Sequence, residues 1–257
     1  MALIVSYPTP AGPRYGLVIE GVIHEWQASL FDDDTFTPGR PLMPVENTQL
    51  NPPVQPGKIV CIGRNYAAHA AEQNAAVPDE PMLFLKPPSA LIGSGATIEI
   101  PAGIGRVDHE SELAVIIGRR ARRVSRDAAL DYVLGYTCAN DVSARAYQKK
   151  DGQWGRAKGF DTFCPLGPWI NTDLDPADVA VRCRVNGELR QDGRTAQLVF
   201  DVPALIEFIS GVMTLLPGDL ILTGTPSGIS ELHDGDVVQV EVEGIGVLEN
   251  PVRVLQP

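Results

Sequence analysis

Cysteine is scarce in this chain. There are four cysteines in 257 residues, and Cys61, Cys138, Cys164 and Cys183 lie far apart, with no Cys-x-x-Cys pair. This scarcity argues against a disulfide-rich scaffold and against a cysteine-ligated zinc site, because both need numerous or closely spaced cysteines. The four residues lie in apolar, strand-like surroundings, so we expect buried free thiols in a reducing compartment.

Positive charge is also in short supply. The 32 Asp and Glu residues outnumber the 21 Lys and Arg residues, which gives a formal net charge of −11 and a pI near 4.8. The one short basic run, residues 119–123, follows an apolar strand pattern and is expected to be a solvated turn. An acidic surface repels nucleic acid and anionic membranes, so neither is an expected partner.

Long apolar runs and phosphate-binding loops are missing too. No stretch reaches the length of a membrane span, and the first residues lack the basic and apolar regions of a signal peptide. No Gly-x-Gly-x-x-Gly motif follows a strand pattern, and the glycine-bearing loop 224–228 is too short to cradle a nucleotide. The expectation is a cytoplasmic protein without a nucleotide-binding loop.

Two units are predicted along the chain. Residues 1–53 form a small β-rich N-terminal domain, with strands at 3–5, 15–19 and 22–26 and a turn at Glu20-Gly21. The stretch 31–56 is rich in Asp, Pro and Asn, which indicates a linker or surface loop. Residues 54–257 form the larger domain.

The larger domain is rich in strands and has few helices. Strand patterns occur at 58–63, 84–86, 109–118, 220–223, 237–242 and 246–248. Helices are predicted at 64–73, at 126–134 with Ser125 as N-cap, and at 202–215 with Asp201 as cap and the apolar period Leu205, Phe208, Ile209 and Val212. Because strands and helices do not alternate regularly, the expected class is α+β, a strand-rich roll.

Three carboxylates stand out in this pattern. Glu110 and Glu112 lie two apart at the start of a predicted strand, so both side chains point to one face. Asp141 follows about thirty residues later and, if 141–148 is helical, shares a face with Arg145 and Gln148. A solvated strand edge is the alternative reading of the two glutamates, but the apolar run that follows places them at the mouth of a buried strand.

These carboxylates indicate a site for a hard divalent cation. Oxygen ligands without a nearby His or Cys cluster favour Mg²⁺ or Mn²⁺ over zinc. An octahedral ion held by three protein ligands would leave about three positions for water or substrate. A substrate with adjacent carboxylate and keto oxygens could take two of them, and the metal would then act as a Lewis acid on the keto oxygen.

An ordered set of motifs from Lys58 onward resembles the fumarylacetoacetate hydrolase family. Each motif is weak alone, but together they span roughly 200 residues in the right order. The motifs are 63–66 (GRNY), 83–87 (LFLKP), 109–113 (HESEL), 140–145 (NDVSAR), 158–163 (KGFDTF), 185–188 (VNGE) and 223–226 (TGTP). The resemblance implies a mixed β-sandwich roll, and the N-terminal 50 or so residues are similar to the small first domain of bacterial two-domain members.

The resemblance also implies roles for individual residues. Glu110, Glu112 and Asp141 match the metal ligands, and His69 and Glu72 match a His–Glu dyad on a mobile lid that activates water. Lys158 and Lys86 match lysines that hold developing negative charge. The predicted substrate-binding residues are Arg64, Tyr66, Lys86, Arg145, Gln148 and Thr225. His109 is expected to serve in packing or behind the ligands.

The implied activity is cleavage of a C–C bond of a 2,4-dioxo acid, of acylpyruvate or fumarylpyruvate type, through a metal-bound enolate. Alternatives within the family are oxaloacetate decarboxylation and the isomerase or decarboxylase reactions of unsaturated dioates. A non-catalytic binding protein on the same scaffold is the alternative of another class, and the complete set of ligands and dyad favours an enzyme. The expected partners are a small 2-oxo acid and a second copy of the chain in a homodimer.

Overall fold

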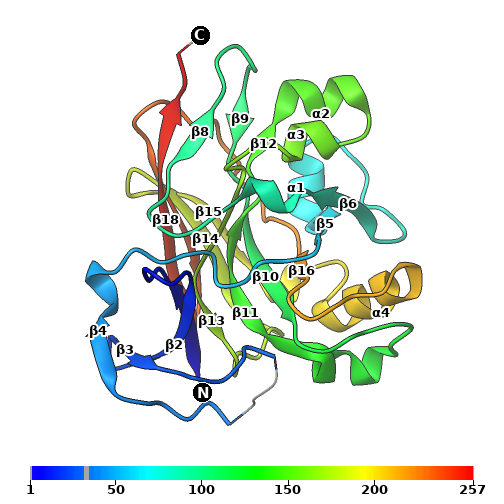
Figure 1. The fold of residues 1–257 in the computed structure, drawn as a ribbon. Coiled ribbons are helices and arrows are strands. Elements are labelled where there is room, and N and C mark those ends of the chain that lie inside the picture. The colour runs from blue at the N-terminus through cyan, green and yellow to red at the C-terminus, as the bar shows by residue number, and fades with distance from the viewer. Residues whose placement is uncertain (1, 32–34, 257) are drawn as a thin grey trace.

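Two β-sheets packed on each other form the frame of the protein (Figure 1). The computed structural model describes residues 2–31 and 35–256. The large sheet has eleven strands, and its hydrogen-bonded order is β4-β3-β2-β1-β13-β11-β10-β16-β5-β6, with β7 paired to β13. The second sheet has five strands in the order β15-β14-β17-β18-β8, and β9 pairs with β12 in a small ladder of two strands. The predicted α+β class, rich in strands and poor in helices, is confirmed.

The strands of the large sheet come from the whole length of the chain. Their bounds are β1 Leu3–Tyr7, β2 Arg14–Ile19, β3 Val22–Glu25, β4 Pro41–Pro44, β5 Ile59–Gly63, β6 Met82–Lys86, β7 Leu91–Ile92, β10 Ser111–Ile117, β11 Val133–Asn140, β13 Cys164–Asn171 and β16 Leu220–Leu222. The other strands are β8 Ile98–Ile100, β9 Val107–Asp108, β12 Ser143–Ala144, β14 Ala180–Val185, β15 Glu188–Arg194, β17 Val237–Val242 and β18 Gly246–Val254.

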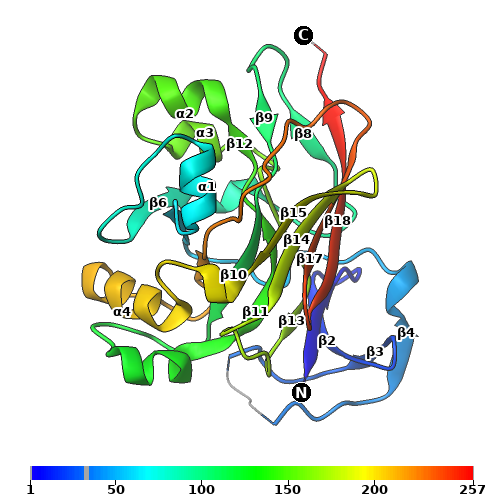
Figure 2. The same ribbon diagram turned by 180° about the vertical axis from the view of Figure 1, so that it is seen from behind.

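The helices are short and few. The α-helices are α1 Ala67–Glu72, α2 Arg145–Asp151, α3 Gly155–Lys158 and α4 Val202–Val212, and the 3₁₀ helices are η1 Val45–Asn47, η2 Pro88–Ala90, η3 Arg126–Tyr132 and η4 Thr195–Gln197. In both ribbon views α1, α2 and α3 gather at the same end of the molecule, whereas α4 lies apart from them (Figure 2). Among the described residues, no helix is long and apolar enough to cross a membrane, and the cytoplasmic location stays a prediction.

Strand β10 is the buried centre of the large sheet. Its seven residues are all buried, and its side chains alternate between two hydrophobic clusters. Leu113 and Val115 pack toward the five-stranded sheet and α4, while Ala114 and Ile116 pack on the opposite face. This alternation follows from the two-residue period of a strand, and it puts Glu112 on the same face as Ala114, as expected.

The N-terminal strands continue the large sheet. The predicted hairpin is present: β2 pairs with β3, and Glu20 and Gly21 both have left-handed backbone angles, with φ of 48° and 77°. Strand β1 pairs with β13 of the following part, and β4 pairs with β3 inside the stretch predicted as a linker. The linker prediction is wrong for residues 41–44, while the domain division at residue 53 stays a prediction.

Two helix predictions need correction. Residues 126–132 form a 3₁₀ helix, Ser125 makes no side-chain cap hydrogen bond, and the chain turns into β11 at Val133. Asp141 lies between β11 and β12, and α2 begins only at Arg145, so Asp141 does not share a helix face with it. In both places long-range pairing with β10 overrides the local pattern, because β11 contributes to the centre of the sheet.

Helix α4 is largely as predicted. The Asp201 side chain accepts a hydrogen bond from the Ala204 backbone N–H, at 3.0 Å, and so caps the helix. Leu205 and Ile209 are fully buried, but Val212, predicted on the same apolar face, is 61% exposed at the helix end. The helix stops three residues earlier than the pattern indicated, because Met213 is already extended.

Candidate active site

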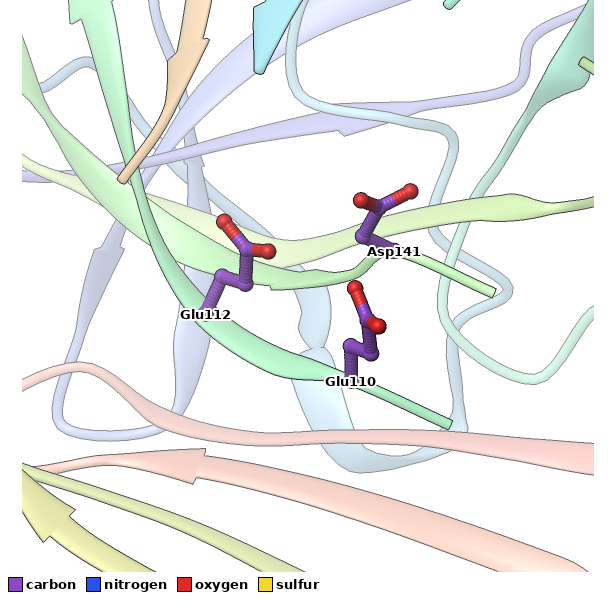
Figure 3. A group of neighbouring side chains, drawn as sticks. All are labelled: Glu110, Glu112 and Asp141. Atoms are coloured by element: carbon purple, nitrogen blue, oxygen red, sulfur yellow. The ribbon is translucent and has the colours of Figure 1, made fainter. Parts of the chain in front are cut away.

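Three carboxylates converge at the end of β10. Oxygen atoms of Glu110, Glu112 and Asp141 all lie within 4.8 Å of one another, and all three residues are buried. Figure 3 shows the three side chains pointing into a shared space, Glu112 from the start of β10, Glu110 from the residue just before that strand, and Asp141 from the residue after β11. The Asp141 backbone N–H donates to the Glu110 carbonyl at 2.9 Å, which ties the two segments together.

Two buried lysines neutralise part of this charge. The Lys158 ammonium donates to Glu110 and to Asp141, at 2.6 Å each, and the Lys86 ammonium donates to Asp141 at 2.7 Å. Both lysines are 1% exposed, so neither is an ordinary surface charge. Burial lowers the pKa of Lys158, but Asp141 and Glu110 raise it by more, so the ammonium form is held.

The glutamates differ in their counter-charges. Burial raises the pKa of Glu110, but the charges of Lys158 and Arg145 lower it by more, so the net shift of the pKa is downward. Burial and the charges of Asp141 and Glu110 raise the pKa of Glu112 well above its usual range. In the described part of the chain Glu112 has no Lys or Arg partner, and it accepts a hydrogen bond from the Gly224 backbone N–H at 2.6 Å.

This donor set fits a divalent cation. The ligand atoms are all carboxylate oxygens, which Mg²⁺ and Mn²⁺ prefer. Glu112 is a buried carboxylate without an ion-pair partner in the described part of the chain, and a cation shared with Glu110 and Asp141 would stabilise its charged form. A cavity of about 10 Å³ lies among them, which is about the space of a single water molecule or small ion.

A histidine faces the same cavity. His69 of α1 is buried, its Nδ1 lies 3.2 Å from Glu72 Oε2, and its Nε2 lies 3.1 Å from the Gln73 amide nitrogen. A neutral His69 donates its Nδ1–H to the Glu72 carboxylate, and its Nε2 lone pair accepts from the Gln73 amide, a contact that a bound water molecule would replace. This arrangement suits a general base, because Glu72 holds the ring orientation and the tautomer.

The loop after β16 joins the dyad to the carboxylates. The Gly224 N–H donates to Glu112, and the Gly228 N–H donates to Glu72 Oε1 at 3.0 Å. Gly228 has φ of 102°, and a Cβ there would lie 2.0 Å from the Arg190 carbonyl oxygen. Only glycine allows this close approach, so the backbone N–H can reach Glu72.

Arg145 is held from three sides. Its Nε donates to Asp108 at 2.8 Å, its Nη1 to Gln148 at 2.9 Å and its Nη2 to Glu110 at 2.6 Å. Burial lowers the pKa of Arg145, and the charges of Glu110 and Asp108 raise it by more. One N–H on each of Nη1 and Nη2 remains for a ligand, because a guanidinium has five N–H donors.

The remaining predicted residues lie around the same centre at different depths. Arg64, Gln148 and Thr225 line the small cavity with His69 and the carboxylates. Tyr66 and Lys86 are outside its lining: Lys86 pairs with Asp141, and the buried Tyr66 hydroxyl lacks a hydrogen-bond partner within the described chain. Burial and the charge of Glu112 raise the pKa of Tyr66, so the hydroxyl stays protonated.

A second, larger cavity adjoins the first. It has a volume of about 640 Å³, and four residues line both cavities: Arg64, Gln73, Gln148 and Trp154. The small cavity is thus the floor of a space large enough for a small organic acid. Glu72 and Arg145 line only the larger one.

Sequence reasoning missed several residues of the site. Gln73 lies four residues after His69, a helical spacing that could have shown it on the same face. Asp108, which pairs with Arg145, precedes the HESEL motif by one residue. No pattern in the neighbouring sequence indicated that Trp154 or Gln191 belongs to the site. Gln191 is fully buried, and its amide nitrogen donates to the Thr225 hydroxyl at 2.7 Å and so positions that loop.

His109 and the four cysteines are buried and have structural roles. His109 is buried between Gln191 and Ser230, at 3.0 and 2.9 Å, and burial lowers its pKa. All four cysteines are buried free thiols, as expected. Burial raises the pKa of Cys138, Cys164 and Cys183 to about 12, so none of these is a ready thiolate nucleophile.

Comparison with known proteins identifies relatives of this arrangement. Protein Rv2993c of Mycobacterium tuberculosis is 52% identical over 225 residues, covering 86% of this chain and 84% of that protein. The oxaloacetate tautomerase fahd2, mitochondrial, of Xenopus laevis is 47% identical over 215 residues, covering 79% of this chain and 67% of that protein. The crystal structure of 5-carboxymethyl-2-hydroxymuconate delta-isomerase from Mycobacterium smegmatis is 48% identical with a TM-score of 0.90, covering 99% of this chain and 100% of that one.

The family assignment follows from the length of the match. The family described as "Fumarylacetoacetate (FAA) hydrolase C-terminal" matches residues 58–253. This range contains every residue of the candidate site, and the solved relative above covers the N-terminal strands too. The chain therefore belongs to the fumarylacetoacetate hydrolase family.

Proposed function

We propose that this protein is a divalent-metal-dependent enzyme that works on the enol or enolate form of a 2-oxo acid. One observation carries the proposal: three buried carboxylates and His69, itself bound to Glu72, face one cavity of about 10 Å³. When bound, Mg²⁺ or Mn²⁺ would polarise the 2-keto oxygen of the substrate as a Lewis acid. The carboxylates of Glu110, Glu112 and Asp141 would hold it.

The residues of the chain supply the other parts of the reaction. The Thr225 hydroxyl lines the inner cavity and Arg145 lines the adjoining larger one, so the hydroxyl and the free N–H groups of Arg145 would orient a substrate carboxylate where the two cavities meet. The Lys158 ammonium lies on the cavity wall, where it stabilises negative charge that develops on the substrate oxygen. Its two carboxylate contacts keep it charged and in position.

The reaction we propose is hydrolysis of a 2,4-dioxo acid of acylpyruvate type. His69 Nε2 takes a proton from water, and the water oxygen attacks the distal C4 carbonyl. The C3–C4 bond then breaks, its electron pair passes into the enolate of pyruvate, and the other product is a carboxylic acid. Protonation of C3 completes the turnover.

Keto–enol tautomerisation of oxaloacetate is the second candidate. It is favoured by a specific likeness, since the Xenopus laevis relative is named an oxaloacetate tautomerase. That reaction needs no attacking water: a base removes a proton from C3, and a proton is added to the C2 oxygen. The Mycobacterium smegmatis structure is likewise named an isomerase.

A panel of substrates separates these reactions. The protein is assayed with added Mg²⁺ on acetylpyruvate, the keto and enol forms of oxaloacetate, and an unsaturated 2-oxo dioate. Loss of enol absorbance and release of pyruvate are followed together. Pyruvate released from acetylpyruvate supports hydrolysis, and enol–keto conversion of oxaloacetate without release of pyruvate supports tautomerisation. No metal-dependent change in any of these compounds would contradict the proposal.

The homodimer is also a proposal. Light scattering at micromolar concentration should give about twice the chain mass of 27.6 kDa. A monodisperse monomer would contradict it.

A further inference from the structure

Strand β15 of the five-stranded sheet contacts the loop that follows β16 of the large sheet. A Cβ on Gly193 would lie 2.5 Å from the Pro226 Cβ, and a Cβ on Gly228 would lie 2.0 Å from the Arg190 carbonyl oxygen. Glycine on each side therefore allows the strand and the loop to meet without side chains between them. The second sheet is thus in direct contact with loop 224–228.

Gln191 is the buried side chain at this contact, and its neighbours fix the orientation of its amide. The Ser111 backbone N–H, which can only donate, lies 3.0 Å from Gln191 Oε1. The Pro226 carbonyl oxygen, which can only accept, lies 2.7 Å from Gln191 Nε2. The reversed amide would place two donors together and two acceptors together, so the chemistry of both neighbours determines the orientation.

This orientation decides which group donates in the contact between Gln191 and Thr225. Gln191 Nε2 lies 2.7 Å from the Thr225 hydroxyl oxygen and can only donate, so the hydroxyl accepts. The hydroxyl's own proton is used by no hydrogen bond among the described residues. Thr225 lines the inner cavity, the space of about 10 Å³ at the carboxylates, and is outside the lining of the larger, outer cavity. The proton is therefore available to a group bound in the inner cavity.

His109 extends the same chain of hydrogen bonds. Its Nδ1 lies 3.0 Å from Gln191 Oε1, which can only accept, so this nitrogen carries a proton. Its Nε2 lies 2.9 Å from the Ser230 hydroxyl, which donates to it when the ring is neutral. From Ser230 through His109 and Gln191 to Thr225, each group donates toward the inner cavity. Hydrogen bonds aligned in this way polarise and strengthen one another.

We propose that Gln191 is a positioning residue that makes Thr225 a hydrogen-bond donor toward the inner cavity. A group bound against the Thr225 hydroxyl must then be an acceptor, which a carboxylate oxygen is and an ammonium group is not. Gln191 acts through Thr225 and does not touch the substrate. The inference rests on the proposed function only in naming that acceptor as the carboxylate of a 2-oxo acid.

The first test reads the direction of these hydrogen bonds without a ligand. In protein labelled with ¹⁵N-histidine, the nitrogen chemical shifts show which ring nitrogen of His109 is protonated. Ser230→Ala assigns the signals, because it removes the contact at His109 Nε2. We expect Nδ1 of His109 to be protonated in the wild type. A ring protonated on Nε2 alone would mean that the Gln191 amide is reversed, and it would overturn the inference.

A double-mutant cycle tests whether Gln191 acts through Thr225. Calorimetry in Mg²⁺ buffer measures the affinity for 2-oxopentanoate, a 2-oxo acid with one carboxylate. Thr225→Val and Gln191→Met should each weaken binding about tenfold, the size expected for loss of a hydrogen bond to a charged group. In the Thr225→Val background, Gln191→Met should change the affinity by less than about threefold, because the hydroxyl that it positions is already gone.

Two further variants sharpen the cycle. Thr225→Ser keeps the hydroxyl and should keep both the affinity and its dependence on Gln191. Asp192→Asn is the matched control and should bind as the wild type does, because Asp192 is the next residue on β15 and its exposed side chain pairs only with Arg182. The histidine measurement uses wild-type Gln191, so it still decides the matter if Gln191→Met does not fold.

The outcomes separate this inference from the proposed function. An equal loss from Gln191→Met in both backgrounds would show that Gln191 only supports the fold, and an unchanged affinity, or no binding of 2-oxopentanoate to the wild type at millimolar concentration, would also overturn the inference. If both tests give the expected results but no 2-oxo acid is converted in the substrate panel, the proposed function fails and the role of Gln191 stands.

Discussion

The charged side chains of the inner and outer cavities differ in their burial and in their ion pairing. In the inner one, Glu110, Asp141 and Lys158 are at most 4% exposed and each has a charged partner within 2.7 Å. In the outer one, Arg106 and Lys149 are exposed, and only Arg106 is tied to a carboxylate. Charges taken out of water interact strongly, whereas exposed ones are screened.

Because of this difference, we expect the inner cavity to carry out the chemical reaction and the outer cavity to affect which substrate is bound. A buried charge that loses its partner is costly, so the inner cluster tolerates little change. An exposed cation contributes modestly and can vary with the tail of the substrate. We expect substitutions to have large effects on turnover at the inner cavity and small effects, confined to affinity, at the outer one.

The largest effect is expected at the carboxylates. Asp141→Asn or Glu110→Gln should lower kcat/KM by at least about 10³-fold, since a bound metal contributes several kcal/mol to catalysis. Circular dichroism should show the fold retained, and calorimetry should show Mg²⁺ binding lost. Glu99→Gln, at an exposed glutamate on β8, is the control. Near-normal turnover with unchanged Mg²⁺ dependence in either variant would place the metal elsewhere.

The next effect is expected at the dyad. His69→Ala should lower acylpyruvate hydrolysis by about 10²–10⁴-fold, the usual cost of removing a general base. Any decarboxylation of oxaloacetate should fall much less, because it needs no attacking water and depends on the metal and Lys158. Both activities are measured on the same preparation. Equal losses would show that His69 does not act by activating water.

Metal binding should also stabilise the fold. Mg²⁺ at about 100 times its Kd should add about 2.7 kcal/mol to the free energy of unfolding, which raises Tm by several degrees in a chain of this size. Thermal melts with Mg²⁺ and with excess EDTA measure the difference. The shift should vanish in Asp141→Asn. A shift that persists in that variant would indicate a stabilising site away from the carboxylates.

The smallest effect is expected from salt. Raising KCl from about 0.05 to about 0.5 M should weaken 2-oxoglutarate binding several-fold, because the exposed basic groups of the outer cavity are screened. The affinity for 2-oxopentanoate should change less, since the proposed function places its one carboxylate at the buried inner cavity. Calorimetry at both concentrations gives the comparison. A salt dependence of equal size for both ligands would remove the contrast between the cavities.

Local patterns in the sequence were enough for about half of the strands, for the capped helix and for the pairing of two glutamates, whereas β11, β13, β14 and β15 were not predicted. The alternation around β10, the Asp201 cap and the Glu20-Gly21 turn all depend on residues close in sequence. The contact between His69 and Glu72 follows from a spacing of three residues on α1. The roles of Lys86, Lys158 and Thr225 came only from resemblance to the family.

Other features depend on contacts between distant segments. Strand β11 forms where a helix was predicted to extend, and β1 joins β13 across more than 160 residues. Lys86 meets Asp141 across 55 residues, and Gln191 reaches His109 across 82. The sequence alone could not show that Arg106, Lys149 and Arg64 line one cavity, because they come from two loops and a helix far apart in the chain.

The sequence by itself determined that Glu110, just before β10, and Glu112, on β10, point to the same side, because an extended chain alternates its side chains whatever surrounds it. Only the tertiary structure decided which charges they meet. It buries Lys158 against Glu110 and Asp141 and leaves Glu112 without an ion-pair partner among the described residues, so that burial and the neighbouring carboxylates raise its pKa. The physical reason is that desolvation and ion pairing depend on distances through space, which the order of residues along the chain does not fix.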